Sequence, residues 1–467
     1  SGTVVAMAPS TGDILGMACY PDYNLNTPFE PNTEELKATW DTLDSTTQSD
    51  ALYNMWKNNV VSSPYEPGSP YKLITAATAL EENITSEDVP NDFYCNGSIE
   101  VADRKISCWT QAHKGAKTLR QALQVSCNPS LIQLGQRIGA ETLYKYYQAF
   151  GFFDKTGIDL PQEASSTYWK LEDVKDVELA TMSFGQRFTI TPIQLVSAVS
   201  AIANDGILMK PRIVKQIINP ETGTTTDIEP VQVRQVISKS TSERMRNLMK
   251  SVVDDGSGRL AKVEGYSIGG KTGTSEPQAG REDEGYIASY VAIAPTEKPE
   301  ICLLIAVHNP NPNNEGSHQG GQVCGPVVSQ MLSEILPYLG LTSSNAQTST
   351  DTVEEDTSYA TVPDIRNKTV TEAEKLLKQA GFTTKVNISG DKNSTLVTDQ
   401  TPKPGSSIPK GSIIVLYTEE NDTRVSVKVR DFKDKTLAQA ENMAKANNLN
   451  ITTEGSGTVI SQSIMVD

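Results

Sequence analysis

Apolar and polar positions alternate near both ends of the first 340 residues, and a helical spacing of apolar positions fills the stretch between them. The alternation predicts strands at Thr3–Met7, Ile14–Ala18, Tyr266–Ile268, Tyr286–Ile293 and Ile301–Val307. The helical spacing predicts helices at Leu73–Glu82, Leu119–Val125, Ser130–Ile138, Leu195–Asn204, Ser242–Val253 and Val327–Tyr338. We therefore expect one α+β domain over 1–340, in which helices cover an antiparallel sheet and also form a helical subdomain.

The apolar pattern disappears at residues 341–358, where the sequence is polar and without periodicity, so we expect a linker there. Beyond it, the sequence from Val362 is repeated from Val429, an offset of 67 residues. Each copy has a loop, an amphipathic helix and apolar runs typical of strands, which predicts small βα modules at 359–420 and 421–467. The second copy lacks its final turn and strand, so we expect the sequence to be a piece of a longer protein.

Composition and charge limit the classes of partner. The chain has 467 residues, with 41 Lys and Arg against 57 Asp and Glu, which gives a net charge of −16. Because no locally basic segment stands out, we expect no nucleic-acid partner. The longest unbroken apolar run, Ile301–Val307, is too short to cross a bilayer, which takes about twenty residues. Ser1 already lies at the start of a predicted strand, so any membrane anchor is expected upstream of this sequence.

The segment YEPGSPYKLITAATALEE places a serine and a lysine three residues apart, at Ser69 and Lys72, where a helical pattern begins. In a helix that starts at the serine, the two side chains lie one turn apart on the same face. Pro70 suits the first helical position, where its missing N–H has no cost. A serine becomes a nucleophile when a neutral lysine takes its proton, and burial lowers a lysine pKa in that direction. The spacing alone is weak evidence, since Ser389 and Lys392 share it without a helical pattern.

Two further segments carry groups that suit the same chemistry. VSCNPSLIQLG offers a hydroxyl at Ser126 to relay a proton and an amide at Asn128 to hold a substrate peptide, although alone it indicates only a helix cap. YSIGGKTGTSEP has two glycines before Lys271, Thr272 and Thr274, on a predicted edge strand that another backbone can approach closely. The Lys-Thr-Gly triplet also occurs at 155–157, in a polar turn.

The order Ser-x-x-Lys, Ser-x-Asn, Lys-Thr-Gly is that of penicillin-binding proteins and β-lactamases. Residues 1–340 resemble class B penicillin-binding proteins, also in GTVVAMAPSTGDILGMACYPDYNLN, TMSFGQRFTITPIQLVSAVSAIANDG, DDGSGRLAKVEGY and GGQVCGPVVSQML. The two tail copies resemble PASTA repeats, and the combination indicates a Gram-positive enzyme of division or sporulation. Pro70 and Tyr71 depart from residues common in the family without removing a catalytic atom, whereas Cys127 stands where some relatives have Asp.

The resemblance implies a serine penicillin-recognising fold, similar to that of β-lactamases and transpeptidases, and peptidoglycan D,D-transpeptidase activity. It implies that Ser69 attacks the carbonyl between the two terminal D-alanines of a stem peptide and forms an acyl-enzyme, with backbone N–H groups of Ser69 and Thr274 as the oxyanion hole. The other residues implied to be catalytic are Lys72 as general base, Ser126 as proton relay, and Lys271, which also grips the substrate carboxylate. The residues implied to bind substrate are Asn128, Thr272, Gly273 and Thr274.

The resemblance also implies partners and a location. We expect peptidoglycan stem peptides as substrate, β-lactams as covalent inhibitors, and a glycosyltransferase with division or sporulation proteins as partners, at the extracytoplasmic face of the membrane. For the tail repeats we favour a positioning role over ligand capture. A D,D-carboxypeptidase or β-lactamase, which gives the acyl-enzyme to water, stays open as an alternative. A non-catalytic wall-binding or sensor protein is the weaker alternative, since all three motifs keep their reactive side chains.

The cysteines and histidines predict no cofactor or metal. The six cysteines include no C-x-x-C pair, and the three histidines include no pair at helical ligand spacing, which argues against zinc. Cys95 and Cys108 flank a predicted hairpin, and the sequence leaves open whether they form a disulfide or stay free. His308 follows an apolar strand, and we interpret it as a strand-end residue.

Overall fold

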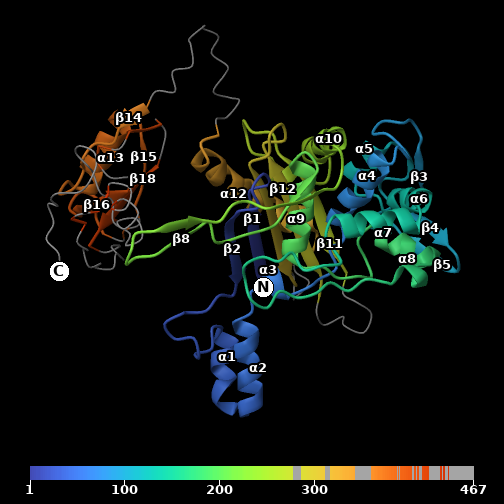
Figure 1. The fold of residues 1–467 in the computed structure, drawn as a ribbon, viewed down its shortest axis with the longest axis horizontal. Helices are drawn as coiled ribbons and strands as arrows, with labels where there is room; N and C mark the ends of the chain where they lie inside the picture. The colour runs from blue at the N-terminus through green and yellow to red at the C-terminus, as the bar shows by residue number, and fades with distance from the viewer. Residues whose placement is uncertain are drawn as a thin grey trace, which may run out of the picture. The chain divides into compact units, whose positions relative to one another are not determined.

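The computed structural model describes residues 1–276, 285–310, 316–341 and 359–419, apart from short gaps at 387, 389, 402–403, 406 and 410–412, and a few positions between 432 and 440. The chain divides into two compact units, shown as a ribbon in Figure 1. The first unit consists of Ser1–Lys215 and Ile228–Ile335, and the second consists of Gln216–Asp227 and Leu336–Asp467.

A five-stranded antiparallel sheet forms the centre of the first unit. Its strands follow the order β11 (Gly269–Ser275), β12 (Ile287–Ala294), β13 (Ile301–His308), β1 (Gly2–Met7) and β2 (Ile14–Tyr20). The first strand of the unit meets a strand from late in its sequence, because the whole of β1 pairs with β13, with Gly2 opposite Val307. The strand that carries the Lys-Thr-Gly segment, β11, lies at one edge of the sheet.

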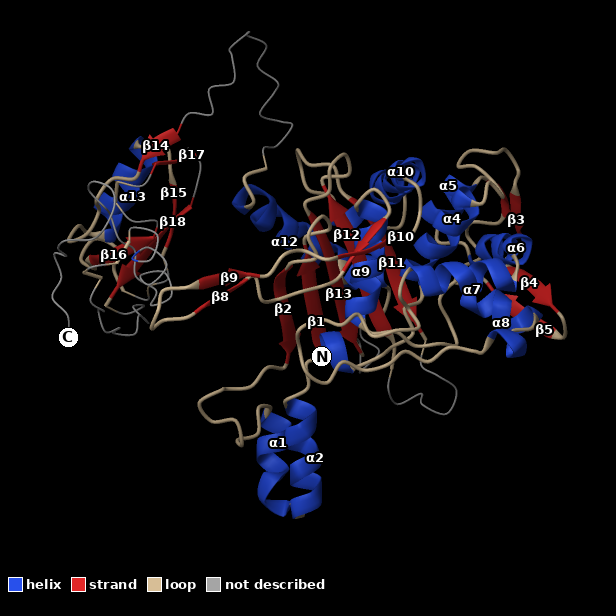
Figure 2. Ribbon diagram, viewed as in Figure 1, coloured by secondary structure: helices blue, strands red, loops and turns tan. Residues whose placement is uncertain are grey.

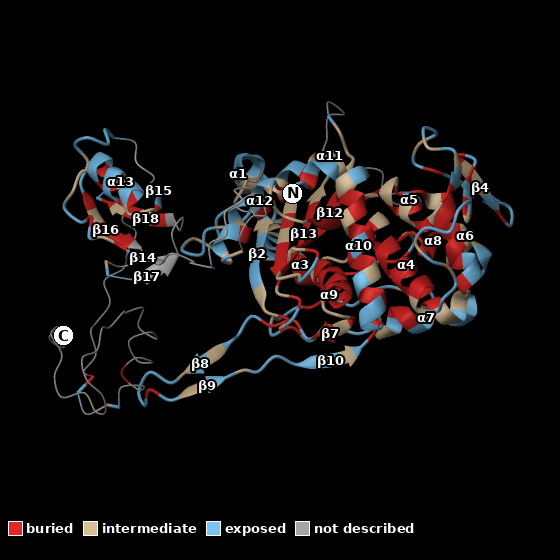
Figure 3. Ribbon diagram, turned by 90° about the horizontal axis from the view of Figure 1, so that it is seen from above, coloured by how far each residue is buried: buried red, intermediate tan, exposed pale blue. Residues whose placement is uncertain are grey.

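Both faces of the sheet are buried over most of its area, although the edge strand β2 contains no buried residue. Successive residues of a strand point to opposite faces, and in β1 the neighbours Val5, Ala6 and Met7 are all buried. Helix α9 (Pro192–Ala203) packs on β1 and β13 and is buried along its whole length, as the red helix in Figure 3 shows. A helix whose residues are mostly apolar on every side is stable inside a core, which explains the central place of α9.

A helical subdomain packs beside the sheet. Helix α4, which begins directly after Ser69–Tyr71, contacts α6, α7, α9 and α10 and is buried over almost its whole length. The helices of this region are α4 (Lys72–Glu81), α5 (Leu119–Gln124), α6 (Asn128–Ile138), α7 (Ala140–Ala149), α8 (Asp176–Met182) and α10 (Lys239–Asp255). Short strands lie between α4 and α5, where β3 (Phe93–Cys95) pairs with β6 (Gly115–Lys117) and β4 (Ser98–Val101) pairs with β5 (Arg104–Ser107).

The remaining elements of the first unit lie around this core. Helices α1 (Glu34–Thr39) and α2 (Ser45–Met55) contain no buried residue and project away from the sheet, as Figure 2 shows. The others are α3 (Asn59–Ser62), β7 (Ile207–Met209) paired with β10 (Gln232–Gln235), α11 (Gly320–Val323) and α12 (Gly325–Tyr338), which continues past the end of the unit.

The second unit contains a small βα module with its own core. Strand β18 (Ile413–Thr418) pairs in parallel with β15 (Thr383–Lys385) and antiparallel with β16 (Val397–Thr401). The module also contains α13 (Val370–Gln379) and β14 (Tyr359–Thr361), which pairs with β17 (Ser407–Pro409). The hairpin of β8 (Gln216–Ile218) and β9 (Thr225–Asp227) is assigned to the second unit as well. Residues 342–358 of the predicted linker and nearly all of the predicted second repeat lie outside the described residues.

The predicted α+β architecture is confirmed, with one wrong strand. All six predicted helices are present, within three residues at each end. The predicted strand at Tyr266–Ile268 is absent, because the chain turns there: Gly265 has a positive φ and the Tyr266 N–H donates to the Val263 carbonyl at 3.1 Å. The strand begins at Gly269 instead. Within the described residues, no helix combines the length and apolar character needed to cross a membrane.

Candidate active site

The turn before Ser69 holds this serine against the edge strand. Gly68 has φ 58°, a conformation that side chains disfavour, and a β-carbon at this position would lie 3.1 Å from Ser275 Oγ and 3.3 Å from the Thr274 carbonyl oxygen. Ser69 then begins a short 3₁₀ turn that continues into α4, with Pro70 as its second residue. The close approach therefore fixes the distance between the serine and β11.

Tyr71, the last residue of the 3₁₀ turn that begins at Ser69, packs into the core. Its ring is fully buried and packs against Tyr147, Phe152 and Phe188, with ring centroids 4.6–5.1 Å apart. Its hydroxyl lies 3.1 Å from that of Tyr168, within hydrogen-bond distance. Aromatic packing of this kind is stiff, so the segment that carries Ser69 and Lys72 has little freedom to move.

Lys72, the first residue of α4, is fully buried and bonds to the Ser126–Asn128 segment. Its Nζ donates to the Ser126 carbonyl at 2.8 Å, to Ser126 Oγ at 3.2 Å and to Asn128 Oδ1 at 2.6 Å. Burial lowers the pKa of Lys72 to about 8, because the charged form loses its water. The neutral amine that a general base requires is thus accessible near neutral pH.

Ser126 lies in the tight turn between α5 and α6, with φ 53°, which is rare for a residue other than glycine. Its Oγ donates to Ser69 Oγ at 2.9 Å. Asn128 follows as the first residue of α6, and since its Oδ1 accepts from Lys72, its amide N–H₂ is the group left to donate. The turn therefore presents a hydroxyl to the serine and an amide donor beside it.

Lys271 reaches the same hydroxyl from β11. Its side chain is fully buried, and Nζ donates to Ser126 Oγ at 2.9 Å and to the Thr272 carbonyl at 3.1 Å. Burial, and then the charge of Lys72, holds the pKa of Lys271 well below its usual range. Two ammonium groups around one hydroxyl oxygen repel each other, so the arrangement favours a neutral form of at least one lysine.

The rest of β11 is arranged for close contacts. A β-carbon on Gly273 would lie 2.6 Å from Pro70 Cδ, so only glycine lets the strand approach the serine turn. Thr272 Oγ1 lies 3.2 Å from Ser257 Oγ, and Thr274 Oγ1 accepts from the Gly320 N–H at 3.1 Å. The edge strand β11 therefore carries the hydroxyl groups of Thr272 and Thr274 close to Ser69.

The structure brings together all eight predicted site residues, which lie on the 3₁₀ turn and the start of α4, on the α5–α6 turn with the first residue of α6, and on β11. Residues 2–333 match the family described as the penicillin binding protein transpeptidase domain. The chain belongs to this family. Residues 360–420 and 427–465 match the PASTA domain, so the predicted resemblance to class B penicillin-binding proteins with PASTA repeats is confirmed.

Several known proteins are similar to this penicillin-binding protein. Stage V sporulation protein D of Bacillus subtilis is 37% identical over 424 residues, which cover 90% of this chain and 61% of that protein. Penicillin-binding protein PbpB of Mycolicibacterium smegmatis is 31% identical over 349 residues, which cover 72% of this chain and 50% of that protein. The chain thus spans about half to three fifths of the length of these curated relatives.

Solved structures agree with this assignment. The D,D-transpeptidase domain of a peptidoglycan glycosyltransferase from Eggerthella lenta has a TM-score of 0.61 and 29% identity, and the match covers 73% of this chain and 79% of that one. Penicillin-binding protein 3 from Mycobacterium tuberculosis, complexed with ampicillin, has a TM-score of 0.62 and 25% identity, with 74% of each chain covered.

The contact between Ser69 and Lys72 in this penicillin-binding protein differs from the direct contact that their helical spacing suggests. The hydrogen bonds connect Ser69 to Lys72 through Ser126 rather than directly. Ser257 was missed by the sequence reasoning, although its hydroxyl adjoins Thr272. The only signal for it is its place in DDGSGRLAKVEGY, one of the segments that resemble the family.

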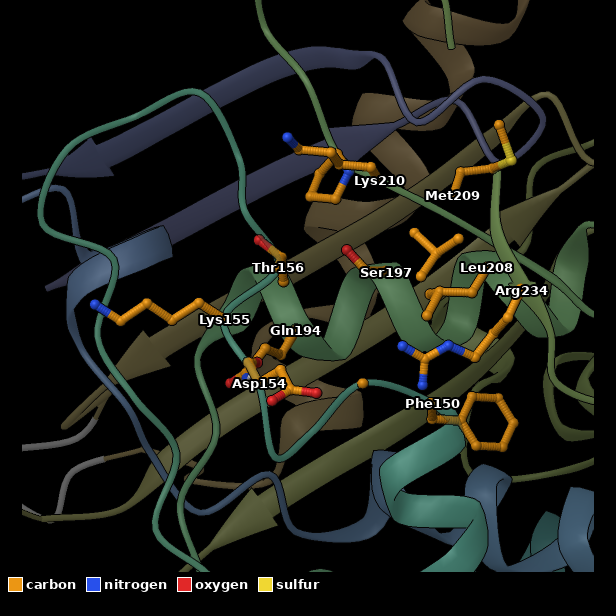
Figure 4. A pocket seen from close by; sticks show the side chains of 13 residues that line it. Phe150, Asp154, Lys155, Thr156, Gln194, Ser197, Leu208, Met209, Lys210 and Arg234 are labelled. Atoms are coloured by element: carbon orange, nitrogen blue, oxygen red, sulfur yellow. Dashed lines mark hydrogen bonds between the residues drawn. The ribbon is translucent and has the colours of Figure 1, made fainter. Parts of the chain in front are cut away.

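The second Lys-Thr-Gly triplet, at 155–157, lies elsewhere. The Glu163 carboxylate accepts from the Thr156 N–H and hydroxyl, both at 2.6 Å, and from the Gly157 N–H at 3.0 Å, which closes a turn. This turn borders a cavity of about 60 Å³ beside α9, shown in Figure 4. None of the eight predicted site residues lines it.

The structure also bears on whether Cys95 and Cys108 form a disulfide and on the position of His308. All six cysteines are free, so Cys95 and Cys108 form no disulfide. His308 is the last residue of β13, as expected, and burial lowers its pKa.

Proposed function

We propose that this penicillin-binding protein is a peptidoglycan D,D-transpeptidase that works through an acyl-serine intermediate. The observation that carries the proposal is the hydrogen-bonded path from Ser69 Oγ through Ser126 Oγ to the amines of Lys72 and Lys271. A serine needs a base to become nucleophilic, and this path provides one whose pKa burial lowers to about 8.

In the first step, Ser69 Oγ attacks the carbonyl between the two terminal D-alanines of a stem peptide. Its proton passes to Ser126, which gives its own proton to neutral Lys72. The carbon–oxygen ester bond forms and the carbon–nitrogen bond breaks, while Lys72 returns the proton through Ser126 to the leaving amine of D-alanine. Charge at the carbonyl oxygen is stabilised by the backbone N–H groups of Ser69 and Thr274.

The edge strand β11 would hold the substrate. An edge strand can pair with an extended peptide, and the hydroxyl groups of Thr272 and Thr274 with the Lys271 amine suit its terminal carboxylate. Gly273 keeps this strand close to the serine turn, and the Asn128 amide donates to a substrate carbonyl. β-Lactams, which carry a strained amide and a carboxylate, would occupy the same place and acylate Ser69.

In the second step, an amine of a neighbouring strand attacks the ester, loses its proton to the Lys72–Ser126 pair and restores Ser69. The competing reading is a D,D-carboxypeptidase or β-lactamase, in which water attacks instead. A β-lactamase needs a positioned carboxylate for that step. In the described part of the chain, the hydrogen bonds of Ser69, Lys72, Ser126 and Lys271 go to hydroxyl, amide and carbonyl groups, which favours the transpeptidase.

Fluorescent penicillin tests the serine assignment. The wild type should gain one covalent label, and Ser69→Ala should gain none, whereas the control Ser333→Ala, on α12, should label fully. Stoichiometric labelling of Ser69→Ala would exclude Ser69 as nucleophile, and an unlabelled wild type would leave only a non-catalytic wall-binding or sensor protein. An acyl-enzyme that persists for hours supports the transpeptidase, and rapid release of hydrolysed penicillin supports the hydrolase.

The biological setting is part of the same proposal. Similarity to stage V sporulation protein D supports a role in spore or division wall synthesis, with a glycosyltransferase and division or sporulation proteins as partners. Stem peptides lie outside the membrane, so the domain would act at the extracytoplasmic face. The PASTA repeats would position the catalytic domain, and micromolar binding of muropeptides by the isolated tail would overturn that role.

A further inference from the structure

Three cysteines and one histidine gather beside the active site, from a stretch of sequence that runs from Cys95 to Cys127. They are Cys95 at the end of β3, Cys108 after β5, His113 before β6 and Cys127 just before α6. Their sulfur and ring nitrogen atoms all lie within 4.8 Å of one another. The three cysteines are buried, and the histidine is half-buried.

The surrounding backbone builds this cluster. Pairing of β3 with β6 puts Cys95 opposite Gly115, and the Cys108 N–H donates to the Gly97 carbonyl at 2.9 Å. The Gly97 N–H in turn donates to Cys95 Sγ at 3.4 Å, a contact that suits a negatively charged sulfur. A strand end, a loop and a helix start are therefore folded so that their cysteines converge.

The histidine is held in the same way. His113 Nε2 lies 3.1 Å from Cys108 Sγ, and Lys117 Nζ donates to the His113 carbonyl oxygen. Trp109 follows Cys108 in the sequence, and its ring lies tilted beside that of His113, with the centroids 5.8 Å apart. The Trp109 Nε1–H donates to the Val125 carbonyl at 3.0 Å. The loop that carries His113 is thus tied to the turn that carries Ser126.

Disulfide chemistry does not account for this arrangement. Three cysteines cannot all pair with one another, and all of them are free thiols in the structure. A buried set of three sulfurs and an imidazole has instead the composition of a tetrahedral zinc site. Zinc bonds of about 2.3 Å to sulfur and about 2.0 Å to nitrogen place the ligand atoms roughly 3.5–3.8 Å apart. The observed separations include 3.1 Å, between Cys108 Sγ and His113 Nε2, and none exceeds 4.8 Å, so the cluster needs only a small adjustment to reach these distances.

We propose that Cys95, Cys108, His113 and Cys127 bind one zinc ion. Because the protein fills all four ligand positions, the site is structural and leaves no open position for a reacting water. Three thiolates with one imidazole favour zinc over magnesium or calcium, which require oxygen ligands. The site closes the β3–β6 region onto the start of α6.

The zinc site would also hold in place the turn between α5 and α6 that carries Ser126. This second part of the inference rests on the proposed function. Cys127 stands between Ser126 and Asn128, and both neighbours bond to Lys72. Ser126 is held at φ 53°, a conformation that persists only when the surroundings enforce it. A metal bond to Cys127 Sγ would provide that restraint one residue from the proton relay, so Cys127 acts as a positioning residue.

Metal analysis of the purified chain tests the site without reference to activity. We expect about one zinc ion per chain in the wild type, and a loss to near zero in Cys95→Ser and in His113→Ala. Cys19→Ser is the matched control, since Cys19 lies outside the cluster, and it should keep its zinc. A wild type that takes up no zinc from added Zn²⁺, or ligand variants that keep it, would overturn the proposal.

A second measurement covers the case that the variants fail to fold. Wild-type protein refolded with Co²⁺ should show the strong visible absorption of a tetrahedral cobalt–thiolate site, and its absence would contradict the assignment.

For the catalytic step, a chelator should slow penicillin labelling at least tenfold, and Zn²⁺ should restore it. If labelling stays unchanged while zinc is removed, the link to Ser126 is wrong. A wild type that binds zinc but never labels would refute the proposed function and leave the zinc site standing.

Discussion

The hydroxyl oxygens of Ser69 and Ser126 lie 2.9 Å apart, with Ser126 as the donor. Ser126 also accepts from Lys271 at 2.9 Å and from Lys72 at 3.2 Å. A hydroxyl has one proton and two lone pairs, so these three contacts use all of its hydrogen-bonding capacity. Every proton that leaves Ser69 by this path must cross Ser126, which makes this serine the point at which the two lysines act on the nucleophile.

Replacement of Ser126 by alanine should therefore slow acylation without unfolding the protein. Loss of a proton-transfer group costs about 10²–10⁴-fold in rate, and we expect the second-order rate constant for penicillin labelling to fall within that range. The rate is measured with a fluorescent penicillin, and thermal unfolding reports the fold. Ser333→Ala, on the outer helix α12, is the control and should match the wild type. Labelling of Ser126→Ala at the wild-type rate would show that Lys72 reaches Ser69 directly.

The acylation rate should rise with pH through the pKa of Lys72. The neutral amine is the active form of the base, and a pKa of about 8 leaves about one tenth of Lys72 neutral at pH 7. The rate should increase about tenfold per pH unit below that pKa and level off above it. Stopped-flow acylation by a chromogenic β-lactam between about pH 6 and 9.5 gives the profile.

Two controls make the pH experiment decisive. Lys72→Gln should lose both the activity and the rising limb, because no titrating base remains. Tyr fluorescence or circular dichroism across the same range should stay constant, which excludes unfolding as the cause. A rate that is flat, or that falls as pH rises from 6 to 8, would contradict Lys72 as the base.

The sequence predicts much of this site because its chemistry is local. Ser69 and Lys72 lie one helical turn apart, and α4 begins where the proline and the apolar spacing indicate. Strand patterns at both ends of one domain also predict a single antiparallel sheet, although not that β1 pairs with β13. The predicted features depend on patterns that each segment carries by itself.

Contacts between distant segments could not be predicted. The φ of 53° at Ser126 and the two lysines that converge on its hydroxyl depend on how α5, α6 and β11 pack. The cluster around Cys127 was missed for the same reason, since its ligands come from β3, two loops and a helix start instead of a short C-x-x-C pair. Turn geometry at Gly265 likewise overrode the alternation that predicted a strand at Tyr266.

Removal of the Tyr71 hydroxyl should affect stability more than chemistry. Tyr71→Phe leaves the half-buried Tyr168 without its hydrogen-bond partner at 3.1 Å and should lower the free energy of unfolding by about 1 kcal/mol. The hydroxyl points to Tyr168 and not to Ser69, so penicillin labelling should keep its rate. Urea unfolding followed by tryptophan fluorescence measures the first effect. The control Tyr53→Phe, on the exposed helix α2, should change neither, and a Tyr71→Phe variant that unfolds like this control would show that the buried contact contributes nothing.

Gly273 and Gly16 offer a matched test of how closely β11 must approach the serine turn. Both lie in strands of the same sheet, yet a β-carbon at Gly273 would lie 2.2 Å from Ser289 Oγ and 2.6 Å from Pro70 Cδ, whereas one at Gly16 meets nothing within 4 Å. The Ser289 hydroxyl can rotate away, but the Pro70 ring cannot, so Gly273→Ala should push Pro70 and with it Ser69. We expect a loss of about 1–3 kcal/mol in stability together with slower penicillin labelling. Gly16→Ala should stay within about 0.5 kcal/mol of the wild type and label normally. If Gly273→Ala is as stable and as quickly acylated as Gly16→Ala, the contact between β11 and Pro70 does not position the nucleophile.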